Sequence, residues 1–257
     1  MESENGPLAC GEVGSGRLAE WDTVQEVLQG LFVDQDLAGQ NILITAGPTR
    51  EALDPARYLS NRSSGKMGYA LARTAKRRGA EVVLVSGPTH LPAPPGITMV
   101  PVQTAAEMAE AVREHASAPN IIIKAAAVAD FRPKNISSLK IKKSTAKLEL
   151  KLELELEPTQ DILTTLGKEQ RSDQVLVGFA AESNNHEAEG RRKLNTKQAD
   201  LIVVNDILGQ QTGFDVDTNQ VTLITQEGAE QLELFSKEET ANKIWDKVIA
   251  LAKMKAR

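Results

Sequence analysis

From residue 41 to its end, the chain alternates short apolar runs with segments of helical periodicity. The runs end at Gly-Pro pairs or polar turns, which is typical of buried strands. They cover residues 41–46, 81–86, 97–102, 120–129, 175–180 and 200–205. Helices are predicted at 66–78, from Thr104 onward, and at 160–166, 188–197 and 237–254, with a hairpin at 221–225 and 231–235. This order predicts an α/β fold, a three-layer arrangement around a mostly parallel sheet.

One stretch has a different period. In residues 147–157 (KLELKLELELE), five leucines alternate strictly with charged residues, which predicts a long strand with one apolar face. Together with a strand at 139–143, it suggests a hairpin. Two interpretations remain open: an antiparallel edge of the main sheet, or an arm that crosses to a second subunit and so covers its leucines. The expected fold is thus a Rossmann-like sheet, with residues 139–157 either at its edge or in a protruding β-arm.

Composition narrows the class of protein. The chain has 257 residues, 41% hydrophobic and 25% charged, as in a globular protein with a large core. One cysteine and three scattered histidines give no disulfide framework and no metal-ligand spacing. No apolar run is long enough to span a membrane, and no signal peptide is visible, so a cytoplasmic location is expected. A net charge of −5 argues against nucleic acid as a partner.

The first 40 residues differ from the rest. Residues 6–16 are too rich in glycine for a regular element to be expected. Residues 21–32 have apolar positions at helical spacing, and 33–40 look like a connector. We therefore expect two parts, 1–40 and 41–257.

The segment between the first strand and the first long helix is the strongest candidate for a binding site. It ends in Ser63, Ser64 and Gly65, where free backbone N–H groups and small residues can hold an anion. Asn61 and Lys66 add donors and charge. The alternative is an ordinary capped helix after a surface loop. Neither a Walker A motif nor a G-x-G-x-x-G motif is present.

Three further groups could take part. Residues 125–130 (AAAVAD) follow a strand, and Asp130 could bind a base, a ribose or a metal, or cap a helix. Lys140 and Lys142 would share one face of the 139–143 strand, with Lys143 opposite, and could close over a polyphosphate. Lys193 and Lys197 lie four apart on one helix. For both lysine groups a solvated surface is the alternative. The metal ligands are unknown, since Mg²⁺ bound through phosphates leaves little trace.

The string ITAGPTREALDPARYLSNRSSGKMGYALA closely resembles phosphopantothenate–cysteine ligase, an enzyme of coenzyme A biosynthesis. The resemblance continues in order through LVSGPTHLPAPPG, AAAVADFRP, KIKK, PTQDIL, VGFAAES, KLNTKQADLIVVND and GFDVDTN at 213–219, and so covers about residues 40–254. The resemblance implies CTP and Mg²⁺ as co-substrate and cofactor, and 4′-phosphopantothenate and cysteine as substrates. It also implies a homodimer with strands that reach across to the partner, which favours the protruding β-arm for residues 139–157. The implied route runs through an acyl-cytidylate and releases pyrophosphate and CMP.

The resemblance also implies roles for individual residues. Asn61 would hold the acyl-cytidylate and assist its conversion, and Lys140 would be a mobile lysine essential for activation. Phosphate and substrate contacts are expected at Ser63, Ser64, Gly65, Lys66 and Lys142. Nucleotide contacts are expected at Lys124, Ala125, Ala126, Asp130, Lys140, Gln160, Asp161, Ile162, Leu163, Phe179, Lys193 and Lys197. Family members commonly have proline where Gln160 stands.

The N-terminal part has its own resemblance. ACGEVGSGRL at 9–18 resembles the end of phosphopantothenoylcysteine decarboxylase, a flavoprotein often fused ahead of the ligase, and its catalytic cysteine would fall on Cys10. Without a flavin-binding body, 1–40 reads as a remnant of that flap plus a linker helix. No decarboxylase activity is expected, although a decarboxylase could be a partner. The rival hypotheses are an NAD(P)-dependent oxidoreductase on a related sheet and a non-catalytic scaffold for a decarboxylase.

Overall fold

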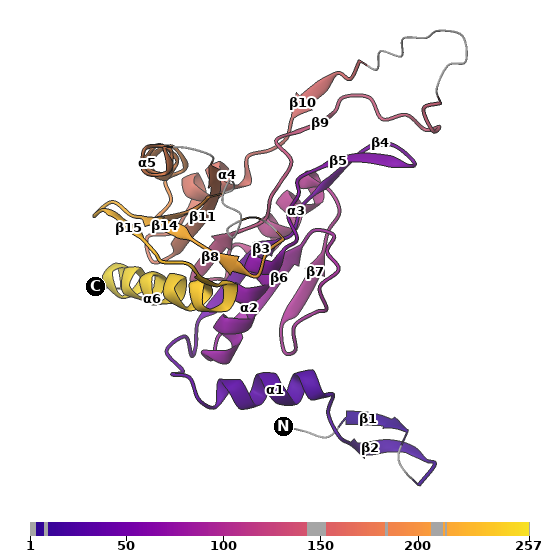
Figure 1. Ribbon diagram of the computed structural model, residues 1–257, viewed down its shortest axis with the longest axis vertical. Coiled ribbons are helices and arrows are strands. Elements are labelled where there is room, and N and C mark those ends of the chain that lie inside the picture. Colours follow the sequence, from indigo (N-terminus) through magenta and orange to yellow (C-terminus); the bar gives the residue numbers. More distant parts are fainter. Residues whose placement is uncertain are drawn as a thin grey trace.

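A computed structural model describes residues 4–7, 10–142, 153–182, 185–206, 213 and 215–256. Its centre is an eight-stranded sheet in the order β15-β14-β12-β11-β8-β3-β6-β7 (Figure 1). The strands are β3 (Asn41–Ala46), β6 (Glu81–Ser86), β7 (Thr98–Pro101), β8 (Ile121–Lys124), β11 (Val175–Glu182), β12 (Leu201–Asp206), β14 (Val221–Ile224) and β15 (Ala229–Gln231). Only β14 and β15 are antiparallel to their neighbours. The predicted mostly parallel sheet is confirmed.

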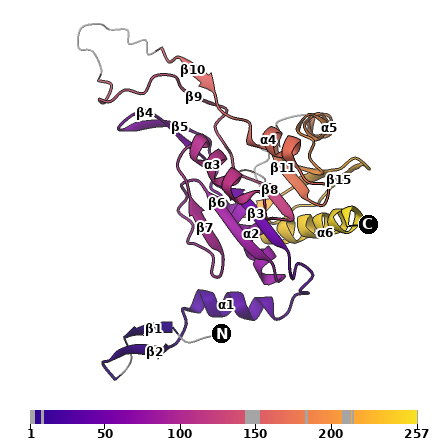
Figure 2. The same cartoon turned by 180° about the vertical axis from the view of Figure 1, so that it is seen from behind.

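Helices cover both faces of this sheet (Figures 1 and 2). Ile42 and Ile44 of β3 pack in one buried cluster with α2 (Lys66–Arg77) and α6 (Lys237–Lys255). Leu43, between them, packs in a second cluster with α3 (Ala105–His115), α4 (Ile162–Glu169) and α5 (His186–Lys197). Successive side chains of a strand point to opposite faces, so an unbroken apolar run buries both. The three layers expected from the sequence are present.

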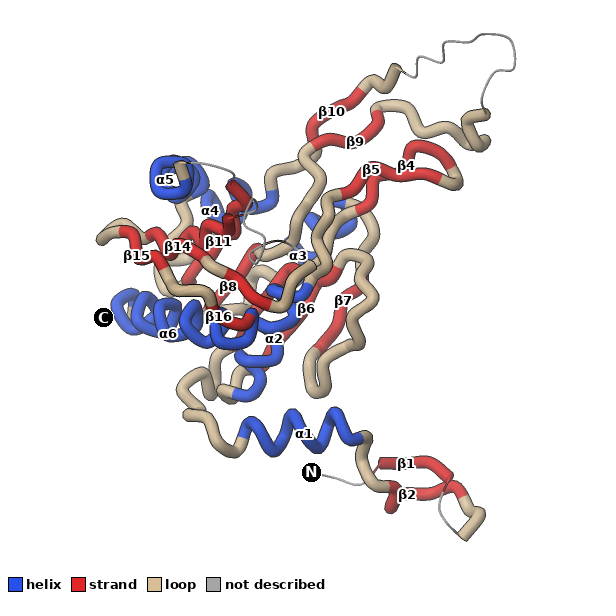
Figure 3. Tube along the Cα trace, viewed as in Figure 1, coloured by secondary structure: helices blue, strands red, loops and turns tan. Residues whose placement is uncertain are grey.

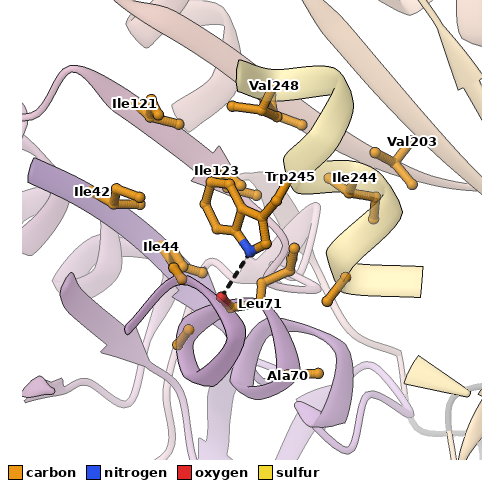
Figure 4. Close-up of a cluster of buried hydrophobic side chains, with 14 of the residues drawn as sticks. Ile42, Ile44, Ala70, Leu71, Ile121, Ile123, Val203, Ile244, Trp245 and Val248 are labelled. Atoms are coloured by element: carbon orange, nitrogen blue, oxygen red, sulfur yellow. Dashed lines mark hydrogen bonds between the residues drawn. The ribbon is translucent and has the colours of Figure 1, made fainter. Parts of the chain in front are cut away.

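Trp245 of α6 lies at the centre of the first cluster and is fully buried (Figure 4). Its indole N–H donates to the carbonyl oxygen of Leu71 at 3.1 Å and to the hydroxyl oxygen of Thr74 at 3.0 Å. A buried indole N–H without a partner would cost free energy, and these two acceptors on α2 remove that cost. Trp245 thereby joins α6, the last helix of the chain, to α2, which carries part of the candidate site.

Gly68 in α2 allows this helix to lie directly against β3. A Cβ added at Gly68 would lie 2.5 Å from the Cβ and 3.1 Å from the Cα of Ala46. We expect Gly68→Ala to lower the free energy of unfolding by about 2 kcal/mol, because overpacking outweighs the gain in helix propensity. Urea denaturation would measure it. Gly228→Ala is the matched control, since its Cβ would meet nothing within 4 Å; an equal loss in both variants would contradict this account.

Arg78, just after α2, joins three segments. Its guanidinium donates to Asp36 at 2.8 and 2.7 Å, to Asp246 at 2.9 Å and to the backbone of Asn242 at 3.2 Å. The hydrogen bond from Arg78 lowers the pKa of Asp36, so this contribution to stability is present above the ordinary carboxyl pKa of 3.8 and is lost as pH falls below it.

We expect Arg78→Met to reduce the free energy of unfolding at pH 7 by about 1–2 kcal/mol, since its carboxylate partners stay accessible to water. The variant should also show a shallower loss of stability between pH 5 and about pH 3 than the wild type. Urea denaturation across that range would measure both effects. Arg191→Met, which removes an exposed pair with Glu187 on α5, is the control.

An arm protrudes from the sheet, as predicted, but with a different pairing. Its base pairs β9 (Phe131–Pro133) with β10 (Leu156–Pro158), outside the main sheet. The strand predicted at 139–143 is wrong for the described residues 139–142, which form none. The backbone N–H of Ile141 donates to Asp54 at 3.1 Å, and its carbonyl oxygen accepts from Arg57. Side chains thus take up the backbone groups of Ile141 that would otherwise pair with a neighbouring strand. Most of the leucine-rich strand predicted at 147–157, and Lys143, lie outside the described residues.

The segment between β3 and α2 contains a hairpin that was not predicted from the sequence. β4 (Arg50–Asp54) and β5 (Arg57–Ser60) pair antiparallel and extend beside β9 (Figure 3). Asp54 makes the turn, because its carboxylate accepts from the backbone N–H groups of Ala56 at 2.8 Å and Arg57 at 2.9 Å. The guanidinium of Arg50 lies 4.7 Å from the ring of Tyr58. Both strands mix polar and apolar residues, so the sequence contains no apolar run from which they could be predicted.

The N-terminal residues form β1 (Glu4–Pro7), β2 (Val13–Arg17) and α1 (Trp21–Gly30), at the opposite end from the arm (Figures 1 and 2). The prediction of no regular element at 6–16 is wrong: β1 and β2 pair antiparallel, and Cys10 lies exposed between them. The predicted helix is confirmed, although none of its residues is buried. Two short strands, β13 (Thr218–Asn219) and β16 (Phe235–Ser236), complete the fold. In the described ranges, no helix is long and apolar enough to cross a bilayer.

Candidate functional site

Two adjoining cavities open at the carboxyl ends of the parallel strands. Their volumes are about 430 and 340 Å³, and Lys124, Val128, Asp130, Phe179 and Lys193 line both, so they form one site, here called the cleft. From β3 the sheet grows through β6 to β7 on one side and through β8 to β12 on the other. The cleft lies at this switch in direction, the usual place for a ligand in an open α/β sheet.

The N-terminus of α2 forms one wall of the cleft. Its N-cap is Gly65, with φ 81°, which has no side chain that could cap the helix. A Cβ at Gly65 would lie 2.7 Å from the methyl carbon of Thr89, so glycine is required both by the backbone and by space. Uncapped N–H groups at a helix start attract anions, which supports the predicted anion site over an ordinary capped helix.

The segment after β8 is held in place by buried hydroxyls. The Thr45 hydroxyl accepts from the N–H of Ala126 at 3.2 Å, and the Thr49 hydroxyl accepts from the N–H of Ala129 at 3.0 Å. Asn61 donates from its amide to the carbonyl oxygens of Ala127 at 3.1 Å and Val128 at 3.0 Å. The Asn61 side chain is therefore fixed against the backbone that lines the cleft.

Lysines line the smaller cavity. Lys193 pairs with Glu182 at 2.6 Å, and Lys197 pairs with Asp161, which also caps α4 by accepting from Thr164 at 2.9 Å. Burial opposes ionisation of Asp161, but the hydrogen bonds from Lys197 and Thr164 outweigh it and lower the pKa of this carboxyl. Burial also lowers the pKa of Lys124, although Asp161 and Asp130 attract its charge. A bound anion would stabilise the protonated lysine, so this wall favours anionic ligands.

A second set of polar groups lies at the end of the larger cavity that the smaller one does not share. Lys66 donates to Asp217 at 2.7 Å and to the backbone oxygen of Asp215 at 2.8 Å. Lys237 donates to the carbonyl oxygens of Gly213, Val216 and Thr218. Burial, and then repulsion from Lys66, lower the pKa of Lys237. The two lysines thus hold Gly213 and residues 215–218 beside the cleft.

Sequence reasoning assigned no role to three residues at this end: Asn205, Asn219 and Lys237. Asn219 is 2% exposed, and the side-chain oxygens of Asn205 and Asn219 are buried without a hydrogen-bond partner in the described part of the chain. The rule that pointed to Asp130, a polar residue where a parallel strand ends, also applies to Asn205 at the end of β12. Asn219 is the last residue of the GFDVDTN motif quoted for the resemblance, but no role was assigned to it there, and no comparable signal marks Lys237.

The structure brings most of the predicted site residues together. The larger cavity is lined by Asn61, Ser63, Ser64, Gly65, Lys66, Lys124, Ala125, Ala126, Asp130, Phe179 and Lys193. The smaller one adds Gln160, Asp161, Ile162, Leu163 and Lys197. Lys140 and Lys142 line neither cavity and are exposed on the arm after β9. Asp161, not Asp130, caps the next helix, which leaves the Asp130 carboxylate to the cleft.

The carboxylates around the cleft do not form a metal site of their own. Within the described residues there is no group of three or more His, Cys, Asp or Glu side chains that could hold a metal ion. Asp161, Asp217 and Glu182 are each paired with a lysine. Asp130 lines both cavities and makes no ion pair within the described residues. The residues therefore fit a metal that is held mainly by a ligand's own phosphates.

The chain matches the family model described as "DNA/pantothenate metabolism flavoprotein C-terminal domain" over residues 37–251. It is 45% identical over 258 residues to the "Coenzyme A biosynthesis bifunctional protein CoaBC" of Bacillus subtilis (strain 168), covering 98% of this chain and 62% of the relative. The protein of the same name from Escherichia coli (strain K12) is 42% identical, with 96% and 61% covered. The chain thus spans about three fifths of the length of these relatives.

Solved structures share the fold. The crystal structure of the C-terminal domain of a bifunctional CoaBC protein superimposes with a TM-score of 0.72 at 42% identity, covering 86% of this chain and 99% of that one. A Cab2 variant in complex with phosphopantothenate-cysteine superimposes with a TM-score of 0.70 at 18% identity, covering 91% and 92%; at that identity the likeness concerns the fold alone. Since the family model spans most of the sequence, this chain belongs to the family of the DNA/pantothenate metabolism flavoprotein C-terminal domain.

Proposed function

We propose that this chain is a phosphopantothenate–cysteine ligase that uses CTP and acts in coenzyme A biosynthesis in the cytoplasm. The observation that carries the proposal is the cleft itself, where the uncapped start of α2 faces lysines that are partly stripped of water. Such a site binds a polyphosphate beside a second anionic substrate. The CoaBC relatives, named for coenzyme A biosynthesis, support the choice of substrates.

In the first step, a carboxylate oxygen of 4′-phosphopantothenate attacks the α-phosphorus of CTP, and pyrophosphate leaves. The product is an acyl-cytidylate. The chain's own task is to offset negative charge, for which Lys193, Lys197 and the N–H groups of α2 are suited. Mg²⁺, bound through the phosphates, would add positive charge at the leaving group, and Asp130 is the carboxylate best placed to join it.

In the second step, the amine nitrogen of cysteine adds to the acyl carbon, CMP leaves with the electron pair of the broken bond, and a proton passes to solvent. No protein nucleophile is required. Asn61 is held by two backbone carbonyls and lines the cleft, so it can keep the acyl group oriented toward the amine. We assign Asn61 to this second step for that reason.

Lys140 is proposed to complete the site from the arm. Hydrogen bonds from Ile141 and Arg57 hold the arm segment against β4–β5, outside the cleft. Exposed apolar side chains lie on both hairpins, including Tyr58, Phe131 and Leu156. A second copy of the chain would cover these side chains and carry the arm toward a cleft, which supports a homodimer. A decarboxylase is a further proposed partner, in line with the bifunctional relatives.

The test is one assay with two nucleotides. The protein is incubated with 4′-phosphopantothenate, cysteine, Mg²⁺ and either CTP or ATP, and pyrophosphate and product mass are followed. Amide product and CMP with CTP are expected. Product with ATP alone would overturn the nucleotide assignment and keep the ligase. No product with either nucleotide would contradict the ligase and favour the scaffold hypothesis, while binding of a nicotinamide cofactor would favour the oxidoreductase.

A further inference from the structure

A second cavity lies on the side of the molecule where α1 packs against α2 (Figures 1 and 2). Its volume is about 580 Å³, within the usual range for a small-molecule site, and among the described residues it shares no lining with the cleft. α2 connects the two places, because Gly65 at its start lines the cleft and Arg73, about two turns further along, lines this cavity. A ligand bound here lies outside the cleft, whatever reaction the cleft performs.

Hydrogen bonds between α1, the segment after it and α2 hold this cavity in shape. The guanidinium of Arg77 donates to both carboxylate oxygens of Glu26, at 2.6 and 2.9 Å. The side-chain amide of Gln35 donates to the backbone oxygen of Gly30 at 3.1 Å and to that of Arg77 at 2.7 Å. These contacts join the end of α1 to the end of α2, so the cavity is formed before a ligand enters it.

Arg73 lines this cavity without a partner in the described part of the chain. Its Nε–H is buried and makes no hydrogen bond there, and its guanidinium makes no ion pair. The neighbouring cations do have partners: Lys76 pairs with Glu81 at 3.0 Å, and Arg77 pairs with Glu26 and with a second carboxylate on α6. A buried donor without an acceptor costs free energy, and a ligand that brings an acceptor recovers it.

We propose that this cavity binds a monocarboxylate with an apolar body, and that Arg73 holds its carboxylate group. The planar edge of a guanidinium donates two parallel N–H groups, which match the two oxygens of a carboxylate. Val27, Leu31 and Pro95 on the walls offer contacts to hydrocarbon. A neutral hydroxyl or carbonyl oxygen also accepts from the Nε–H, but it leaves the charge of Arg73 without a counter-ion and so binds more weakly.

The carboxylates near the cavity limit the charge of the ligand to one. Arg77 faces both Glu26 and Glu238, so these three side chains together carry one negative charge in excess. That excess opposes a phosphate dianion or a nucleotide, which would bring two or more negative charges. A cationic ligand would in turn be repelled by Arg73. A single negative charge matches the charge of Arg73 and adds no further repulsion.

Isothermal titration calorimetry with octanoate tests the site. Octanoate is expected to bind with a Kd of about 1 mM or lower, as its ten heavy atoms allow. Octanol and octylamine have the same chain length without the negative charge, and each should bind about tenfold more weakly or worse. The comparison of these three probes uses the unaltered protein and needs no variant.

The variant Arg73→Met keeps the apolar stem and removes the charge, so its affinity for octanoate should fall about tenfold or more. Arg192→Met is the matched control, since it removes an exposed arginine of α5 that pairs with Glu189, and it should bind octanoate as the wild type does. Without octanoate, Arg73→Met should resist urea at least as well as the wild type, because the buried N–H has no hydrogen bond to lose.

Each other outcome overturns the proposal. Unchanged octanoate binding by Arg73→Met would place the anion elsewhere, and a loss of binding in Lys193→Met would place it in the cleft. Octanol that binds as tightly as octanoate would show an apolar cavity without an anion site. A clear loss of stability in ligand-free Arg73→Met would show that Arg73 already has a partner. Absence of binding to the wild type at about 10 mM octanoate would remove the site altogether.

Discussion

Replacing Lys140 with glutamine is expected to lower ligase turnover about 10²–10³-fold while the protein stays folded and keeps its oligomeric state. Lys140 is exposed on the arm and lines neither cavity, so its side chain contributes little to packing. Its proposed role is to neutralise the triphosphate, and glutamine keeps the approximate size but removes the charge. The rate of pyrophosphate release at saturating CTP measures the effect, since activation is the affected step.

Lys168→Gln, which removes an exposed lysine in the last turn of α4, is the matched control and should be fully active. Circular dichroism and size-exclusion chromatography would establish that both variants are folded and have the same assembly. A Lys140→Gln protein with wild-type turnover would remove Lys140 from the catalytic residues, and an unfolded one would mean that it acts in packing.

Replacing Asn61 with aspartate is expected to separate the two half-reactions. The Asn61 amide donates to the carbonyl oxygens of Ala127 and Val128, and a carboxylate would face both with oxygen atoms alone. Two hydrogen bonds would become repulsive contacts, and the orientation of the acyl group would be lost. We expect amide formation to fall about 10²-fold or more, with pyrophosphate still released.

Rapid-quench measurement of pyrophosphate and amide product in one turnover tests this assignment directly. Asn242→Asp is the control, because it makes the same chemical change at a half-buried position of α6 outside the cleft. A normal yield of amide from Asn61→Asp would end the assignment of Asn61 to the second step. Equal loss of both products would place Asn61 in nucleotide binding instead.

The parallel sheet and its helices could be predicted because their signals are local. Each parallel strand is buried on both faces, so 41–46 and 81–86 read as unbroken apolar runs. The start of α3 could be predicted in the same way, because threonine is a typical N-cap residue. In the structure, the Thr104 hydroxyl accepts from the N–H of Glu107 at 3.2 Å. The base of the arm and the β4–β5 hairpin could not be predicted, because each buries little apolar surface. Their positions depend on contacts between distant segments, such as the hydrogen bond from the N–H of Ile141 to the Asp54 carboxylate.

The cleft was predictable to a similar extent. Gly65 and Lys66 indicate the start of a helix. The residues that follow β8 lie at the carboxyl-terminal edge of the sheet, where ligands bind in open α/β folds. The family resemblance supplied chemistry that no spacing could show. No role could be assigned to Asn219 from the sequence, because its missing hydrogen-bond partner depends on the residues around it. Only the folded chain shows that Lys66 and Lys237 donate to other groups and leave the Asn219 oxygen without a donor.

By itself, the sequence determined the α/β class, the order of the main strands and helices, and the start of α2 after Gly65. These features follow from the hydrophobic periodicity and the backbone chemistry of short stretches of sequence, and they do not depend on contacts between distant segments. The tertiary structure alone decided which polar groups share the cleft, the protonation tendencies of Lys124 and Lys237, and the position of Lys140 outside it. Those depend on burial and on charges from segments far apart in the chain, which no local pattern encodes.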